Sequence, residues 1–430
     1  MSAITFPDGF LWGSATSAHQ IEGENTQNDW WAWEQAGRVR TASGLACDHY
    51  RRFRDDVELI SRLGHTAYRF SVEWSRIEPA QGQFDAQALA HDRELVDALR
   101  QRGITPIVTL HHFTNPLWLA RAGGWTNPSV IEWFSRYTEQ VADALGDRVR
   151  YWLTINEPMV YIYMHHLTGE GPPGASDPQQ AMRVLEHLIR AHAASYRILH
   201  QRVRPADGPV QVSVASYLPV FVPCRPWWPL DRVATLITDR MFNAAFLDAV
   251  TQGRWALPGA AKRRISEAKG TLDFLGVNYY RRHVIRFRPF GGVWAAESCD
   301  VAHHRRHEKE STSWMHWGVH PESFFVTLTR WAGLGLPILV TENGTPMADD
   351  ARRWSYIYRH LQQLARALEA GAQIFGYCYW SLMDNYEWSH GFRPRFGLVE
   401  VDYRTQERRP RASALKFAEV CRTNRLVIER

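Results

Sequence analysis

The sequence predicts an α/β protein in which residues 1–430 form one domain, a (β/α)8 TIM barrel. Eight apolar runs of strand length alternate with amphipathic stretches of helix length, the pattern of parallel strands joined by helical crossovers. Neither a linker nor a shift in composition divides the 430 residues, and barrels of this class reach that size as one domain. Two of the apolar runs end directly at a glutamate, at the rim where a barrel carries its catalytic groups.

The expected strands are short apolar runs that end at polar residues. In chain order they are Phe10–Ala15, Thr66–Phe70, Thr105–Leu110, Arg150–Ile155, Val210–Ala215, Phe274–Asn278, Ile338–Thr341 and Ile374–Trp380. The expected helices carry apolar residues at helical spacing. They are Asp48–Leu63, Ala86–Gln101, Ser129–Leu145, Pro178–Val203, Thr235–Ala249, Pro321–Trp331, Ala351–Ala370 and, after the last strand, Ala412–Arg422.

Three helix ends have a local chemical signature. In Asn127-Pro128 and in Asp177-Pro178 a capping side chain precedes a proline, and proline suits the first position of a helix. Gly371 follows the helical pattern of residues 351–370, where a left-handed glycine ends many helices. We therefore expect helices to begin at the two prolines and one to end at Gly371.

A long loop at about residues 281–320 interrupts the alternation. It contains His303-His304-Arg305-Arg306-His307, which could suggest a metal site, but the spacing matches no standard ligand pattern. A solvated loop is the preferred interpretation. Because the loop follows the sixth strand, it should border the entrance to the catalytic rim. We predict no metal ligand and no cofactor.

Composition limits the class of partner and the compartment. The net charge of +5, from 50 Lys and Arg against 45 Asp and Glu, is too balanced to indicate nucleic acid or an anionic membrane. The five cysteines show no C-x-x-C spacing, which predicts reduced thiols in a cytoplasmic protein. The first residues have no signal-peptide pattern, and no apolar run reaches the length of a membrane span. The 19 tryptophans raise the odds of a carbohydrate ligand, although most will fill the core.

Two motifs place a glutamate beside an asparagine at a strand end. They are Thr154-Ile155-Asn156-Glu157-Pro158 and Thr341-Glu342-Asn343-Gly344, each preceded by an apolar run. Either motif alone could be an ordinary strand-to-loop transition. Two of them together favour a matched pair of carboxyl groups, which is the arrangement that hydrolyses glycosidic bonds.

Other polar and aromatic residues cluster at the predicted strand ends. Amides, an imidazole, carboxyl groups and indoles meeting at one mouth would make a hydrogen-bonding cage for a polyhydroxylated ring. Any one of them alone could be a satisfied polar residue at a strand terminus. In chain order they are Gln20, Arg69, His112, Asn156, Glu157, Asn278, Tyr280, Glu342, Trp380, Glu387 and Trp388.

With these motifs the sequence resembles the retaining β-glycosidases of glycoside hydrolase family one over nearly its whole length. The resemblance rests on short motifs in a specific order and spacing. They are Phe10-Leu11-Trp12-Gly13-Ser14-Ala15-Thr16, Gln20-Ile21-Glu22-Gly23, Tyr68-Arg69-Phe70-Ser71, the two glutamate motifs, Asp273-Phe274-Leu275-Gly276-Val277-Asn278-Tyr279-Tyr280 and Trp380-Ser381-Leu382-Met383-Asp384-Asn385-Tyr386-Glu387-Trp388.

The resemblance implies a role for each of these residues. Glu342 would be the nucleophile and Glu157 the acid/base, while Asn156 would hold the sugar 2-hydroxyl. Tyr280 would orient Glu342, and Arg69 would keep it ionised. The remaining contacts to the glycone, with Trp380 as platform beneath the ring, would come from Gln20, His112, Asn278, Glu387 and Trp388. Trp317 would line the leaving-group side.

Three positions depart from the family pattern. Phe113 replaces a tryptophan after the third strand, so it keeps an aromatic face but lacks the indole N–H. Met159 stands where many members carry tryptophan, and His316 where a glycine often precedes Trp317. These departures concern the preference for glycone and aglycone, and leave the reaction type unchanged.

The resemblance implies a cytoplasmic exo-acting β-glucosidase with β-galactosidase or β-fucosidase side activity, whose partner is a small β-glycoside or oligosaccharide. A 6-phospho-β-glycosidase is disfavoured because Glu387 would repel phosphate. A non-catalytic sugar-binding barrel is disfavoured because both glutamates are present. A transglycosylase stays open, since it shares the covalent intermediate. The natural substrate and the oligomeric state are not determined by the sequence.

Overall fold

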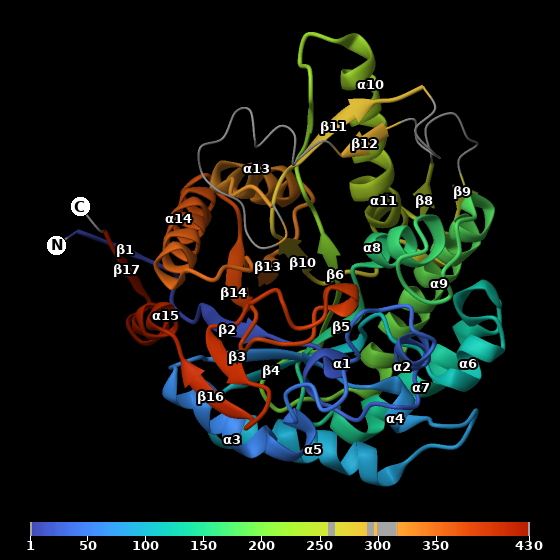
Figure 1. Ribbon diagram of the computed structural model, residues 1–430, viewed down its shortest axis with the longest axis horizontal. Helices are drawn as coiled ribbons and strands as arrows, with labels where there is room; N and C mark the ends of the chain where they lie inside the picture. Colours follow the sequence, from blue (N-terminus) through green and yellow to red (C-terminus); the bar gives the residue numbers. More distant parts are fainter. Residues whose placement is uncertain (1, 257–262, 290–295, 299–314, 316, 429–430) are drawn as a thin grey trace.

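The computed structural model describes residues 2–256, 263–289, 296–298, 315 and 317–428, with backbone only for 296–298. Eight parallel strands close into a barrel in the spatial order β10-β13-β14-β2-β3-β4-β5-β6, which confirms the predicted fold (Figure 1). The barrel strands are β2 (Leu11–Ala15), β3 (Ala67–Ser71), β4 (Thr105–His111), β5 (Tyr151–Asn156), β6 (Gln211–Tyr217), β10 (Leu275–Tyr279), β13 (Ile338–Asn343) and β14 (Ile374–Trp380).

Helices surround the barrel and connect its strands (Figure 1). The longer ones are α3 (His49–Arg62), α5 (Ala86–Gln101), α7 (Val130–Leu145), α9 (Pro178–Arg202), α10 (Pro229–Asp239), α11 (Ala245–Gln252), α13 (Pro321–Ala332), α14 (Asp350–Glu369) and α15 (Ala412–Thr423). Short helices lie in the strand-to-helix connections: α1 (Ala18–Ile21), α2 (Asp29–Gln35), α4 (Trp74–Ile77), α6 (Leu117–Arg121) and α8 (Pro158–Ile162). None of the helices in the described ranges is long and apolar enough to cross a membrane.

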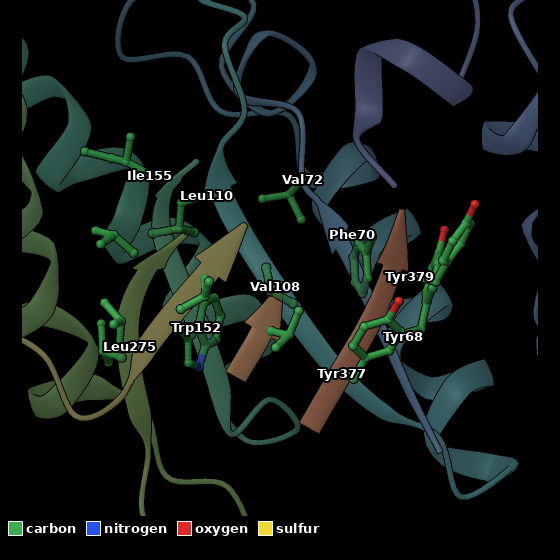
Figure 2. Close-up of a cluster of buried hydrophobic side chains, with 14 of the residues drawn as sticks. Tyr68, Phe70, Val72, Val108, Leu110, Trp152, Ile155, Leu275, Tyr377 and Tyr379 are labelled. Atoms are coloured by element: carbon green, nitrogen blue, oxygen red, sulfur yellow. The ribbon is translucent and has the colours of Figure 1, made fainter. Parts of the chain in front are cut away.

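The strand side chains divide into two apolar clusters because successive residues of a strand point to opposite faces. The smaller cluster includes Ala67, Ile107, Leu153 and Leu339 and fills the barrel interior. The larger cluster lies between the strands and the helices, and Figure 2 shows part of it. Its labelled members are Tyr68, Phe70, Val72, Val108, Leu110, Trp152, Ile155, Leu275, Tyr377 and Tyr379. Strands buried on both faces explain why the sequence runs are continuously apolar.

Two of the three predicted helix ends are confirmed, and the third is displaced. The Asp177 carboxylate accepts the N–H groups of Gln179 and Gln180 at 2.8 and 3.2 Å, with Pro178 at the first helical position. Gly371 is left-handed, with φ +93°. The helix after Asn127-Pro128 starts only at Val130. There the Asn127 side chain accepts the N–H of Ser129 at 3.0 Å, so it forms a turn one step before the helix.

The predicted helix Thr235–Ala249 is wrong as a single element. The structure has α10, a π-helical turn η3 (Arg240–Ala244) and α11 in series. The Asn243 side chain donates to the backbone oxygen of Pro219 at 2.9 Å and to Asp239 at 2.8 Å. These two bonds stabilise the widened turn. The periodicity of apolar residues in the sequence does not distinguish such a turn from an ordinary α-helix.

The predicted loop at 281–320 is not entirely irregular. Within it, β11 (His283–Phe287) pairs in parallel with β7 (Phe221–Pro223) and antiparallel with β12 (Ala296–Ser298). Together with α10 these strands form a small unit beside the barrel, at the top of Figure 1. The histidine run at 303–307 and His316 lie outside the described residues.

Short two-stranded sheets complete the fold. Strands β1 (Ala3–Thr5) and β17 (Arg425–Val427) pair near the two chain ends, and the other pairs are β15 (Val399–Asp402) with β16 (Glu407–Pro410) and β8 (Arg254–Trp255) with β9 (Arg263–Arg264).

Candidate active site

A cavity of about 1320 Å³ opens at the carboxyl ends of the barrel strands. It brings together most of the residues that the sequence singled out: Gln20, His112, Asn156, Glu157, Tyr280, Trp317, Glu342, Trp380, Glu387 and Trp388 line it. Arg69 and Asn278 are fully buried behind the cavity wall and do not line it. The predicted set is therefore contiguous, with two members in a supporting layer.

Glu342 is held by a cation and a hydroxyl. One carboxylate oxygen accepts from the Arg69 guanidinium, and the other accepts from the Tyr280 hydroxyl. Burial is nearly complete, because only 3% of Glu342 is exposed. A buried carboxylate with two charge-assisted hydrogen bonds is fixed in orientation.

Glu157 is buried under different conditions. Its carboxyl group accepts from Asn278 at 2.8 Å. Burial raises its pKa to about 8, the negative charge of Glu342 adds to the rise, and the Asn278 hydrogen bond opposes it. Burial is the larger of the two causes. At neutral pH Glu157 therefore carries its proton.

Asn156 and His112 have defined orientations. The Asn156 oxygen accepts from Arg69 at 2.7 Å and from Asn278 at 3.2 Å, so its amide N–H₂ faces His112 Nε2 at 3.1 Å. His112 Nε2 therefore acts as the acceptor and the ring proton sits on Nδ1. Burial and the Arg69 charge hold the pKa of His112 well below its usual value. This imidazole is neutral.

Irregularities in strand register aim these side chains. Where β10 pairs with β13, the register shifts between Val277 and Asn278. Where β13 pairs with β14, it shifts between Val340 and Asn343. Where β5 pairs with β6, it shifts between Leu153 and Asn156. A bulge re-aims the side chains beside it. All three shifts lie at the strand ends that carry the cavity residues.

Glu387 forms a second acidic corner of the cavity. Gln20 donates to its carboxyl group at 3.1 Å. Burial, with a smaller contribution from the Glu342 charge, raises the pKa of Glu387 to about 8. The nearby Arg395 donates to Asp384 at 3.3 Å. Glu387 itself lines the cavity.

Aromatic rings frame the same corner. The His112 ring lies nearly parallel to Trp380 and Trp388, at centroid separations of 5.9 and 6.4 Å. The ring of Phe113, one of the three departures from the family pattern, lies beside that of Trp388 at a centroid separation of 5.4 Å. Phe113, Glu157 and Trp388 all have positive φ, of +73°, +45° and +49°. Such backbone strain in non-glycine residues is typical of functional sites.

The sequence did not predict the apolar wall of the cavity. Flexible and aromatic side chains from several elements form it. They are Val160, Tyr163, Met164, Leu167, Met182, Leu185, Tyr217, Phe221, Met241, Phe242 and Ile285, beside the already noted Met159. These residues come from several separate segments of the chain and carry no polar motif, so only the fold assembles them. A stretch of methionines within 25 residues, Met159, Met164 and Met182, was the one available signal.

Within the described part of the chain, no group of three or more His, Cys, Asp or Glu residues could hold a metal ion.

Comparison with known proteins agrees with this geometry. The sequence profile of Glycosyl hydrolase family 1 matches residues 2–426. "Thermostable beta-glucosidase B" of Thermobispora bispora is 36% identical over 98% of this chain and 92% of its own length. "Beta-glucosidase A" of Thermotoga maritima is 32% identical over 99% of this chain and 100% of its own length.

Solved structures agree in fold. A β-glycosidase from Pyrococcus horikoshii superposes with a TM-score of 0.93 at 40% identity, over 99% of this chain and 97% of that one. A Thermotoga maritima family 1 glycoside hydrolase complexed with a cyclophellitol analogue transition state mimic gives a TM-score of 0.91 at 31% identity, over 99% and 100% of the two chains. The chain therefore belongs to glycosyl hydrolase family 1 and is a retaining glycoside hydrolase.

Proposed function

We propose that this glycoside hydrolase is an exo-acting β-glucosidase, which removes terminal, non-phosphorylated β-D-glucosyl groups by double displacement. The proposal rests chiefly on the different environments of the two glutamates. Glu342 is bonded by Arg69 and Tyr280, whereas Glu157 has a pKa raised to about 8. One carboxylate and one carboxylic acid are the two groups that this chemistry requires.

In the first step the Glu342 carboxylate attacks the anomeric carbon. The glycosidic bond breaks, its electron pair goes to the leaving oxygen, and that oxygen takes the proton of Glu157. In the second step Glu157, now ionised, takes a proton from water, whose oxygen displaces Glu342 from the sugar. The residue changes from acid to base between the two steps, and free enzyme is regenerated.

The glycone contacts follow from the cavity wall. Asn156 and His112 face the glutamate pair and supply hydrogen-bonding groups for the sugar hydroxyls, while Trp380 offers an apolar face to the ring. Gln20, Glu387 and Trp388 bind the opposite end of the sugar. Arg69 and Asn278 act as positioning residues, because neither lines the cavity. Trp317 borders the leaving-group side.

Glu387 supports the choice of a non-phosphorylated sugar. Burial and the Glu342 charge raise its pKa to about 8, which indicates that this corner disfavours a negative charge. A dianionic phosphate would bring two negative charges to the same place. We therefore expect glucosides to be better substrates than 6-phosphoglucosides.

We further propose that the enzyme works in a reducing compartment such as the cytoplasm. The four cysteines in the described ranges, Cys47, Cys224, Cys378 and Cys421, are all free thiols. Free buried thiols are typical of proteins that are kept reduced.

The test combines substrate choice with stereochemistry. Nitrophenyl β-glycosides of glucose, galactose, fucose, mannose and glucose 6-phosphate should show highest kcat/KM for glucose, with galactose and fucose next. Proton NMR of early product should show the β-anomer first, because carboxyl groups roughly 5–5.5 Å apart give retention. Initial release of the α-anomer, or a preference for the 6-phosphate, would overturn the proposal.

Two variants separate the roles of the glutamates. Glu342→Ala should abolish turnover of every substrate, with partial rescue by azide or formate to a product of inverted anomeric configuration. Glu157→Ala should slow poor leaving groups far more than activated aryl groups, because only the former need a proton. Equal loss on both kinds of substrate would contradict the assignment of Glu157 as the acid.

A further inference from the structure

The surface of α10 carries a cluster of exposed apolar side chains, here called the apolar crest: Trp227, Trp228, Leu230, Val233 and Leu236. Their exposed fractions are 74%, 38%, 42%, 52% and 62%. In the described part of the chain, eleven large apolar side chains are exposed, and five of them fall within residues 227–236. Single exposed apolar residues are normal, but a contiguous group indicates an interaction surface.

Helix geometry explains why these residues share one face. Leu230, Val233 and Leu236 follow at intervals of three along the helix, so they lie on neighbouring turns. The opposite side is buried through Asp231, Ala234 and Thr235. The crest is therefore the outward face of a helix whose inner face already packs against the protein. In Figure 1 this helix stands away from the barrel, beside β11.

Most of the exposed charged residues around the crest are arginines. Arg232, Arg240, Arg286 and Arg288 are exposed on α10, at the start of η3 and on the segment of β11. Arg225 borders the base of the crest, where a cavity of about 380 Å³ is lined by Arg225, Trp228, Leu230, Arg286, Phe287, Arg288 and Pro289.

The two acidic residues of this stretch are neutralised. Asp231 pairs with Arg225 at 2.8 Å, and Asp239 pairs with Arg330 at 2.6 Å. Between residues 221 and 240, and again between 283 and 289, no other aspartate or glutamate occurs. On the paired strand β12, Glu297 lies opposite Arg286 in the register. Arginines still outnumber acidic residues at the rim, which is locally cationic although the whole chain is nearly balanced at +5.

We propose that the apolar crest and its arginine rim dock this protein on an anionic lipid surface. Indole rings and aliphatic side chains insert at the headgroup boundary, and flanking arginines pair with anionic lipids. The net charge of the whole chain, which by itself does not indicate an anionic membrane, averages over this local excess.

The charges also distinguish this occupant from a second copy of the chain. A two-fold interface sets the same patch against itself, so the arginine rims of two protomers would lie opposite each other. Like charges brought together in this way oppose association. An anionic bilayer presents the complementary sign.

Docking at this place has a structural link to the active site. The crest helix continues directly into η3, whose Met241 and Phe242 line the catalytic cavity, and the adjoining β7 and β11 add Phe221 and Ile285. Trp227 and Leu236 do not line that cavity. Substitutions at these two positions therefore separate docking from catalysis.

Vesicle sedimentation tests the proposal. The full-length protein should sediment with vesicles of 70% phosphatidylcholine and 30% phosphatidylglycerol in 50 mM salt, and much less with phosphatidylcholine alone. Raising the salt to 500 mM should release it, because the attraction is screened. The double variant W227D/L236D should lower the lipid partition coefficient at least about tenfold, and Arg232→Ala about fivefold.

A matched control uses the other side of the molecule. Leu415 on α15 is 59% exposed, close to the 62% of Leu236, so Leu415→Asp introduces the same change outside the crest. It should leave sedimentation unchanged. Hydrolysis of a soluble nitrophenyl β-glucoside should be equal in the wild type and all variants, which shows that each remains folded.

Three results would overturn the proposal. They are absence of sedimentation with anionic vesicles, equal loss in Leu415→Asp, or a concentration-dependent dimer in sedimentation velocity that W227D/L236D abolishes. The last result would assign the crest to a second copy of the chain.

Discussion

Asn278 connects the two catalytic motifs at the scale of single residues. Its amide N–H₂ donates to Glu157 at 2.8 Å and to Asn156 at 3.2 Å, and its oxygen accepts from Thr341 at 2.6 Å. One side chain thus joins the end of β5 to the residue before Glu342. Since Asn278 is fully buried, it sets the position of Glu157 without touching the sugar in our proposal.

The pH dependence of kcat/KM should reveal this role. Hydrolysis needs the protonated form of Glu157, so activity should fall as pH rises through about 8. Because the Asn278 hydrogen bond lowers the pKa of Glu157, Asn278→Ala should move the basic limb to higher pH and lower kcat roughly tenfold or more.

Thr154→Val is a control for Asn278→Ala. It removes a buried hydrogen bond of 2.7 Å to His192, whose other ring nitrogen contacts the Thr271 backbone oxygen, so neither glutamate is a partner. Activity should therefore fall at the same high pH as in the wild type. An unmoved basic limb in Asn278→Ala would contradict the positioning role.

Glu387 should separate substrates by their 6-hydroxyl. The carboxyl group in this buried corner, protonated at neutral pH, can form hydrogen bonds with the hydroxyls at C4 and C6, each worth about 0.5–1.5 kcal/mol. Glu387→Ala should therefore lower kcat/KM on β-glucosides about ten- to a hundredfold. Loss on β-fucosides, which lack the 6-hydroxyl, should be smaller.

Glu170→Ala, which alters an exposed carboxyl group of the same cavity, should affect the two sugars alike. Equal loss in Glu387→Ala would instead indicate a structural role.

At the scale of elements, the ends of the barrel strands depend on close backbone contact. A Cβ atom placed on Gly344 would lie 1.8 Å from the backbone oxygen of Trp380, and one on Gly13 would lie 2.1 Å from that of Ala67. These glycines permit neighbouring strands to approach at the rim. Gly344 also follows Glu342 by two residues, so its environment bears directly on the nucleophile.

Gly344→Ala should destabilise the β13–β14 contact and displace Glu342 and Trp380. We expect a loss of about 1–3 kcal/mol in urea unfolding, together with a fall in kcat. Gly333→Ala is the comparison, since Gly333 has helical φ and meets only the Arg330 oxygen at 3.1 Å. If both variants lose the same stability and activity, the contact with Trp380 has no special importance.

Sequence patterns predicted the barrel strands to within about two residues at either end, because each strand is buried on both faces and reads as a continuous apolar run. They also located the glutamates, which sit where the runs stop. They could not place the register shifts at Asn278 and Asn343, since a bulge depends on the partner strand. The apolar wall and the crest were missed for a related reason. Burial and exposure of apolar residues in α9 and α10 are properties of the assembled fold.

At the scale of the whole molecule, buried carboxyl groups should couple stability to pH. Glu157 and Glu387 have folded pKa values of about 8 against 4.5 in the unfolded chain. The folded state then binds more protons than the unfolded state between these values, so stability falls as pH rises from about 4.5 to about 8. Below about pH 4.5 this contribution is fully present.

Glu387→Gln removes one of these ionisations. Calorimetry should show a Tm above that of the wild type by at least about 2 °C at pH 9, and a difference that shrinks at pH 5. Glu400→Gln, at an exposed position on β15, should not change the pH dependence. A gain in Tm that is equal at both pH values would contradict the assignment.

The closing pair of the barrel, β14 with β2, sets an order of events during synthesis. The Ser381 hydroxyl donates to the backbone oxygen of Ala15 across 366 positions of chain. At about 5–20 residues per second, a ribosome needs roughly 20–70 s to travel that distance. Throughout this interval β2 has an open edge and Gln20 has no Glu387 to bond. A message that stops before codon 374 therefore yields an inactive chain with an unpaired strand, available to other nascent chains.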